Sequence, residues 1–274
     1  MPLTRLYCDK CDVPPTDLDK YAIGSCSCIP EPLQALVIQD EAENYHNSLP
    51  KDTFTATMLT GCLRKTFLKK TVEYDITPKA RYPAIRGRII HGILEGYHEP
   101  WLKEERYEKR VGNITLTGQI DAENPEEAEI VDYKTMADDG FTFLKEGPKK
   151  DHVLQVNIYS WLRNGGRNLR TRIISKMIAK KLTIWYVGMR NAAKTGAWVN
   201  VKNGWKVGRY FLKPVPVMDY EDVESFIRQA TQILSDGFKC RAMPPMTTEK
   251  WMCKVCEVKK QCEAIEDFNE RGKV

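Results

Sequence analysis

Apolar residues recur at three- and four-residue steps in several stretches of the chain. In the clearest stretch, Ile85, Ile89 and Ile93 form one stripe that continues to Tyr97, which predicts a helix ended by Pro100. Similar spacing predicts helices beginning at position 153 and spanning 219–235, the latter with a glycine at 237 just past its end. These three helices carry the strongest periodicity in the chain.

Two weaker helices and several strands complete the pattern. A connector helix is expected over 33–47, and Asp52 or Thr53 is expected to cap a helix through 58–65. Alternation predicts strands over 108–122, 129–134 and 182–189. The turn-rich segment 123–125 predicts a hairpin between the first two strands, and Asn203-Gly204 predicts another tight turn. We expect an α/β fold with a central mixed sheet flanked by helices.

The composition is that of one main domain with an appendage. The chain has 274 residues, 42% of them apolar, and no apolar run long enough to span a membrane. Its first twenty residues carry four aspartates and do not resemble a secretory signal. We therefore expect a soluble, cytoplasmic protein without a membrane partner.

Charge is distributed unevenly along the chain, whose net charge is +5. Residues 152–218 contain thirteen Lys and Arg and no Asp or Glu, with several Trp and Tyr among them. A polyanion is the natural partner of such a stretch, and Arg170, Arg172 and Lys181 are candidate nucleic-acid contacts. The alternative is a solvated basic face over core aromatics.

Two carboxylates and a lysine suggest a cation site. Asp121 and Asp132 are expected on neighbouring strands, and Lys134 follows Asp132 at the spacing that places both side chains on one face. Carboxylate oxygens suit Mg²⁺, and the ammonium could orient an attacking water. An Asp-X-Lys triplet alone is weak evidence, because charged residues alternate on many solvated strands.

Four segments in consecutive order strengthen this interpretation. They are Gly87-Arg-Ile-Ile-His91 with Glu95, Gly118-Gln-Ile-Asp121, Asp132-Tyr-Lys134 and Gln155-Val-Asn-Ile-Tyr159. In order and spacing they resemble the motifs of RecB-like nucleases of the PD-(D/E)XK superfamily. The resemblance implies a restriction-endonuclease-like core.

The resemblance also implies roles for these residues. His91, Asp121 and Asp132 would bind Mg²⁺ or Mn²⁺ together with the Tyr133 carbonyl, and Lys134 would act on the water. Gln155 and Tyr159 would contact DNA. The implied activity is metal-dependent hydrolysis of phosphodiester bonds in DNA, by an exonuclease that prefers single-stranded ends and works 5′ to 3′. A non-catalytic DNA-binding module of a recombination or CRISPR-adaptation complex, or a site-specific endonuclease, is the alternative.

Nine cysteines in a chain without a secretory signal favour metal ligation over disulfides. Cys62, Cys253, Cys256 and Cys262 could hold either zinc or a 4Fe-4S cluster. Their split arrangement resembles the iron-sulfur ligands of RecB-like nucleases, including the CRISPR-associated exonuclease and the AddB nuclease domain. The resemblance therefore implies iron and a cluster that fastens the C-terminal tail.

A second set of cysteines lies near the start of the chain. Cys8, Cys11, Cys26 and Cys28 have the spacing of a zinc knuckle, with unligated thiols as the alternative. Because the first fifty residues carry eight acids, we expect protein docking or stabilisation from this module and no DNA binding. The expected domains are residues 1–48, the acidic module with its connector, and residues 49–274, the nuclease domain with its cluster.

Overall fold

The computed structural model describes most of the chain between Pro30 and Arg271. The described residues are 4–6, 16–17, 28, 30–42, 49–76, 78–96, 101–136, 144, 146–188, 199–200, 206–207, 210–240, 243–247, 250–254 and 256–271. Contacts divide the chain into two compact units, which are described separately. The first comprises Met1–Phe54, Gly61–Arg86 and Ala230–Val274, and the second comprises Thr55–Thr60 and Gly87–Gln229.

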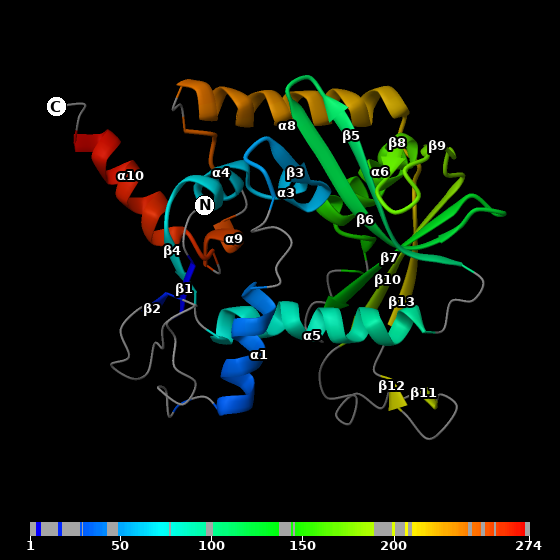
Figure 1. Cartoon of the computed structure of the whole chain (residues 1–274), viewed down its shortest axis with the longest axis horizontal. Helices are drawn as coiled ribbons and strands as arrows, with labels where there is room; N and C mark the ends of the chain where they lie inside the picture. The colour runs from blue at the N-terminus through cyan, green and yellow to red at the C-terminus, as the bar shows by residue number, and fades with distance from the viewer. Residues whose placement is uncertain are drawn as a thin grey trace. The chain divides into compact units, whose positions relative to one another are not determined.

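A mixed β-sheet forms the centre of the second unit (Figure 1). Its strands follow the order β13-β10-β7-β6-β5-β8-β9. Only β7 and β10 pair in parallel among these neighbours, and the other pairs are antiparallel. The strands are β5 (Leu102–Val111), β6 (Ile114–Asn124), β7 (Glu129–Met136), β8 (Asn164–Asn168), β9 (Ile174–Lys176), β10 (Lys181–Gly188) and β13 (Tyr210–Val215). The expected α/β class and mixed sheet are confirmed.

The long hairpin of β5 and β6 corrects one prediction. A single strand was expected over 108–122, but the chain reverses at Gly112 and Asn113, where Val111 pairs with Ile114. Gly112 has a φ of +58°, a left-handed conformation that glycine adopts without the steric cost of a Cβ atom. The apolar alternation continues on both sides of the turn, which hid the reversal in the sequence. The expected hairpin between β6 and β7 is confirmed, with Ala122 opposite Val131.

Helix α6 (Lys150–Arg163) packs against β5, β6, β7 and β10, as the periodicity from position 153 predicted. Its buried residues include Val156, Ile158 and Leu162. Gly118 of β6 leaves room for this helix, because a Cβ atom there would lie 2.7 Å from Leu162 Cδ1 and 3.0 Å from ring atoms of Tyr159. The short helix α3 (Ala56–Thr60) also packs on α6.

Gly118→Ala is therefore expected to lower the free energy of unfolding by about 1–3 kcal/mol, the usual cost of overpacking a close-packed interior. Gly92→Ala is the matched control, because a Cβ atom there meets nothing within 4 Å and the residue lies inside a helix. That control should stabilise the protein by up to about 1 kcal/mol through helix propensity. Chemical denaturation measures the free energy of unfolding of both variants. An equal change in the two would show that the space beside Gly118 is not tightly packed.

Helices α5 (Pro78–Glu95) and α8 (Tyr220–Cys240) each contribute residues to both units. The prediction for α5 missed its first two turns. Ile85 is buried, but Ile89 and Ile93 are more than half exposed, so the expected stripe is only partly internal. The prediction that a glycine follows the end of α8 was wrong, because Gly237 lies inside the helix.

The first unit contains a small sheet and several helices. Strands β1 (Thr4–Leu6), β2 (Thr16–Asp17) and β4 (Tyr74–Ile76) form the sheet in the order β2-β1-β4. Phe238 packs on Phe54 and Phe67, with ring centroids 6.0 and 5.0 Å apart, and this packing favours continuation of α8 past Gly237. The helices are α1 (Glu31–Ala42), α4 (Leu63–Thr71), α9 (Lys250–Lys254) and α10 (Lys259–Arg271).

The region between positions 52 and 71 differs from its prediction. Strand β3 (Thr53–Thr55) precedes α3, and the chain is extended at Cys62 before α4 begins, so two helices replace the expected one. The side chain of Thr55 accepts a hydrogen bond from the Met58 amide at 3.3 Å, and thus Thr55 takes the capping role expected of Asp52 or Thr53.

The predicted turn at Asn203-Gly204 lies outside the described residues. The strands flanking it, β11 (Val199–Asn200) and β12 (Lys206–Val207), pair antiparallel. Within the part of the chain that the structure describes, no helix has both the length and the apolar character needed to cross a membrane.

Candidate active site

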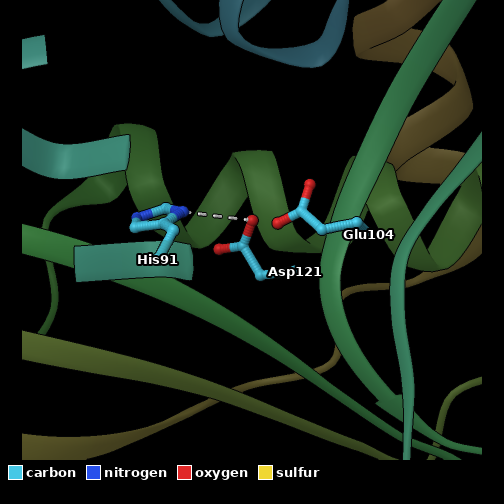
Figure 2. A group of neighbouring side chains, drawn as sticks. All are labelled: His91, Glu104 and Asp121. Atoms are coloured by element: carbon cyan, nitrogen blue, oxygen red, sulfur yellow. Dashed lines mark ion pairs between the residues drawn. The ribbon is translucent and has the colours of Figure 1, made fainter. Parts of the chain in front are cut away.

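Three side chains from different elements converge beside the central sheet (Figure 2). They are His91 of α5, Glu104 of β5 and Asp121 of β6, and one donor atom from each lies within 4.8 Å of the others. His91 Nδ1 is 3.6 Å from Asp121 Oδ1. One imidazole nitrogen and two carboxylate oxygens form a donor set that suits a divalent cation such as Mn²⁺ or Mg²⁺.

The backbone holds Asp121 in position. Its Oδ2 atom accepts a hydrogen bond of 2.6 Å from the Tyr133 amide, so the other oxygen faces His91. Asp121 is buried, and this charge-assisted bond fixes the carboxylate before any cation binds. The backbone at Tyr133, whose carbonyl was a predicted ligand, therefore lies next to Asp121.

Asp132 and Lys134 project from β7 as a close ion pair. Lys134 Nζ lies 2.7 and 2.6 Å from the two oxygens of the Asp132 carboxylate, as the strand alternation predicted. Burial raises the pKa of Asp132 to about 6, although Lys134 opposes this shift. The adjacent ammonium of Lys134 therefore favours the ionised form of a carboxylate that burial disfavours.

Electrostatic interactions link the cluster around Asp121 with the ion pair of Asp132 and Lys134. For His91, burial lowers the pKa, but the hydrogen bond and charge of Asp121 outweigh it and the net shift is upward. Asp132 and Lys134 also act on His91, with opposite signs. Negative charge thus dominates around the imidazole, which favours a cation at this position.

Gln155 and Tyr159 lie one turn apart on the buried face of α6. The Gln155 amide donates to the Tyr159 hydroxyl at 2.6 Å and to the Thr57 hydroxyl of α3 at 3.2 Å. Burial, together with the charges of Asp132 and Asp121, raises the pKa of Tyr159 well above its usual value. The two side chains therefore connect α3 to the carboxylates, and Tyr159 stays protonated.

His152 adds a neutral imidazole next to the site. The Tyr186 hydroxyl accepts a hydrogen bond from the Lys149 amide at 3.2 Å and shares another with His152 Nδ1 at 3.0 Å. Burial, followed by the charge of Lys134, lowers the pKa of His152 to about 4. The motifs gave no signal for this residue.

This shift predicts a pH dependence of stability. Between pH 6.5 and about 4 the unfolded chain binds a proton at His152 and the folded protein does not, so stability falls as the pH falls. From pH 7 to pH 5 the loss from this residue is roughly 2 kcal/mol. His152→Asn should lose correspondingly less than wild type when denaturation is compared at the two pH values, and parallel curves would contradict the assignment.

The model of the PD-(D/E)XK nuclease superfamily matches residues 99–263, which include both aspartates, Lys134 and Gln155. The chain belongs to the PD-(D/E)XK nuclease superfamily. It is therefore a nuclease of a superfamily that uses divalent metal ions on DNA, and the donor set around Asp121 fits that requirement.

Two solved structures resemble this nuclease at low sequence identity. The crystal structure of SSO0001 is 17% identical with a TM-score of 0.46, covering 82% of this chain and 91% of that one. A phage-related exonuclease from Haemophilus somnus 129PT is 14% identical with a TM-score of 0.33, covering 60% and 71%. No curated protein sequence matches this nuclease.

Two of the predicted DNA contacts form ion pairs with buried glutamates of the nuclease. Arg170 pairs with Glu105, and Lys181 lies 2.8 Å from Glu129. Both basic side chains remain more than half exposed. Arg172 is exposed and has a left-handed backbone. The DNA-binding role of all three residues stays a prediction. Arg170 and Lys181 remain available at the surface although each pairs with a glutamate.

Cys62, Cys253, Cys256 and Cys262 lie in the first unit, and none of them forms a disulfide. Cys62 precedes α4, Cys253 lies in α9, Cys256 follows it, and Cys262 lies in α10. Helices α4 and α10 are in contact, and Cys62 acts electrostatically on Cys256, so both halves of the set approach each other. Of the N-terminal set, Cys28 is exposed, and Cys8, Cys11 and Cys26 lie outside the described residues.

Proposed function

We propose that the protein is a Mg²⁺- or Mn²⁺-dependent deoxyribonuclease, most simply an exonuclease that prefers single-stranded ends and proceeds 5′ to 3′. The observation that carries the proposal is the donor group around Asp121 beside the ion pair of Asp132 and Lys134. The direction and the strand preference rest on the resemblance to RecB-like nucleases alone.

A divalent cation in this site would stabilise charge on the scissile phosphate and lower the pKa of a bound water. His91, Asp121 and Asp132 would hold it, and the Tyr133 amide would keep Asp121 in place. Lys134 Nζ would exchange its contact with Asp132 for one with the attacking water or the phosphate, because the ammonium can donate three hydrogen bonds. Asp132 must be ionised for either arrangement.

DNA would approach the same face. Tyr159 would donate to a phosphate oxygen, because its raised pKa keeps the hydroxyl protonated, and Gln155 would orient that hydroxyl. Arg170, Arg172 and Lys181 would contribute positive charge, which increases affinity for any sequence. Contacts to phosphates without base contacts suit a nuclease that acts on DNA of any sequence.

A cleavage assay separates this proposal from its alternatives. Anaerobically purified protein is incubated with end-labelled single-stranded, duplex and circular DNA, with and without Mg²⁺ or Mn²⁺. Release of mononucleotides or short products from single-stranded 5′ ends, with circles left intact, is expected. Cutting of circles would identify an endonuclease, and metal-dependent binding without any cleavage would identify a non-catalytic module of a recombination or CRISPR-adaptation complex.

A 4Fe-4S cluster on Cys62, Cys253, Cys256 and Cys262 is the second part of the proposal. Arg64 supports it, because its Nη1 atom is 3.9 Å from Cys262 Sγ and its Nε donates to the Pro244 carbonyl at 2.8 Å. Arg64 also pairs with Glu266 of α10. This largely buried guanidinium ties the C-terminal tail to α4 and offsets the negative charge of a thiolate. The thiolates would ligate the iron, and the cluster would fasten the unit without redox chemistry.

For the N-terminal module, residues 1–48, we propose one zinc ion on Cys8, Cys11, Cys26 and Cys28. Its acidic sequence disfavours DNA and favours contact with another protein. The nuclease domain, residues 49–274, would not need this module for cleavage, even though strand β1 of the module pairs with β4 of that domain.

A further inference from the structure

Glu104 is the member of the converging group that the nuclease motifs do not include. It lies on β5 between Lys103, which pairs with Ala122, and Glu105, which pairs with Ile120, so it stands directly opposite Asp121. Residues opposite each other in an antiparallel pair share one face of the sheet. Figure 2 shows the Glu104 carboxylate pointing toward Asp121.

The backbone at Glu104 has an uncommon conformation. Its φ is +52°, in the left-handed region that costs a residue with a side chain roughly 1–2 kcal/mol. Like charges placed directly opposite in a sheet are also unfavourable. The fold therefore accepts two separate costs to bring this carboxylate within 4.8 Å of His91 and Asp121.

Neighbouring side chains hold Glu104 in this orientation. Gln119 lies two residues before Asp121 on β6, and its side-chain Nε2 donates a hydrogen bond to Glu104 Oε2. The Arg106 guanidinium in turn donates to Gln119 Oε1. One carboxylate oxygen is thus fixed by the amide, which aims the side chain toward Asp121. Such outer contacts are typical of ligands that must keep one geometry.

We propose that Glu104 binds the divalent cation directly, together with His91 and Asp121. The inference rests on the proposed metal dependence. Two carboxylates balance the charge of a divalent cation, and the three donors come from three different elements, α5, β5 and β6. The cation would convert the repulsion between Glu104 and Asp121 into two attractions.

Mn²⁺ binding to the full-length protein tests the proposal without relying on cleavage. Titration calorimetry of wild type and Glu104→Gln should show affinity for Mn²⁺ at least about tenfold lower in the variant, as expected when a metal site loses a fixed partner. Glu108→Gln is the matched control, because Glu108 lies on the same strand and pairs with Arg167. The control should bind Mn²⁺ as wild type does.

Glu104→Gly separates ligation from a structural role. Glycine relieves the left-handed strain and removes the repulsion, so the metal-free protein should unfold at the same or a higher temperature than wild type. The rise in unfolding temperature on adding Mn²⁺ should at the same time shrink or vanish. A merely structural Glu104 would give the opposite pattern, with lower metal-free stability and an unchanged response to Mn²⁺.

The outcomes also separate this inference from the proposed function. Equal Mn²⁺ affinity in wild type and Glu104→Gln, with wild type cleaving DNA, would overturn the role of Glu104 and leave the nuclease intact. Wild type that neither binds Mn²⁺ nor cleaves with any divalent cation would overturn the proposed function itself.

Discussion

Asp132→Asn is expected to lower the rate of DNA cleavage by at least about a thousandfold, because a catalytic cation lowers the activation barrier by several kcal/mol. Asparagine keeps the size of the buried side chain and removes the charge that faces Lys134. Binding of single-stranded DNA should persist, since the basic side chains at Arg170, Arg172 and Lys181 are untouched. Asp121→Asn and Lys134→Met are expected to have effects of the same order.

Initial cleavage rates and DNA affinity, measured for each variant in Mg²⁺ and in Mn²⁺, check this result. Glu126→Gln is the control, because Glu126 lies exposed on the turn between β6 and β7, the two strands that carry the aspartates. A variant at Asp121, Asp132 or Lys134 that kept full activity would remove that residue from the active site. Loss of DNA binding in parallel with cleavage would point to misfolding, which the unfolding temperature would reveal.

Replacement of Cys62, Cys253, Cys256 or Cys262 by serine is expected to remove the iron. The protein should then lose its visible absorbance, and the first unit should become less stable. Metal ligation by thiolates couples directly to folding and contributes about 10–16 kcal/mol in small structural zinc sites. The cysteines come from segments nearly two hundred residues apart, so the long loop they close adds to the effect. Iron content, visible absorbance and thermal unfolding of anaerobic preparations measure the three consequences.

Cys28→Ser is the control for the cluster, because Cys28 is exposed and belongs to the other cysteine set. Iron should stay at the wild-type level in this variant. Zinc without iron in anaerobic wild-type protein, at a level that falls when Cys62, Cys253, Cys256 or Cys262 is replaced by serine, would show that these four cysteines form a zinc site. Arg64→Leu should retain the ligands but lose iron faster on exposure to air, because it frees the tail at Pro244 and Glu266.

The sequence predicted those parts of the molecule whose signals are local. The stripe of α6, the strand β10 and the spacing of Asp132 and Lys134 follow from periods of 3.6 and 2 residues, and the structure has all three. Ends of elements were less predictable. Gly237 stays helical because Phe238 has partners in the core, and no local rule contains that information.

Glu104 was missed because one turn was missed. Once the chain reverses at Gly112 and Asn113, Glu104 and Asp121 lie equally far from the turn and must face each other. The continuous alternation across that turn concealed the reversal, and the strand was thus expected to begin only at Glu108. His152 could not be found in the same way, since its partner Tyr186 is brought to it by the parallel pairing of β7 and β10.

The division of the chain has a consequence for its synthesis. Most of the second unit is one continuous segment, Gly87–Gln229, whereas the first unit needs segments from before and after it. On the ribosome the central sheet can form early, but α4 must wait for α10 to emerge before its contacts exist. Cys62 is therefore synthesised long before Cys253, Cys256 and Cys262. For the proposed cluster, delivery of iron would follow synthesis of the tail and would be open to competition from oxidants and from other metals.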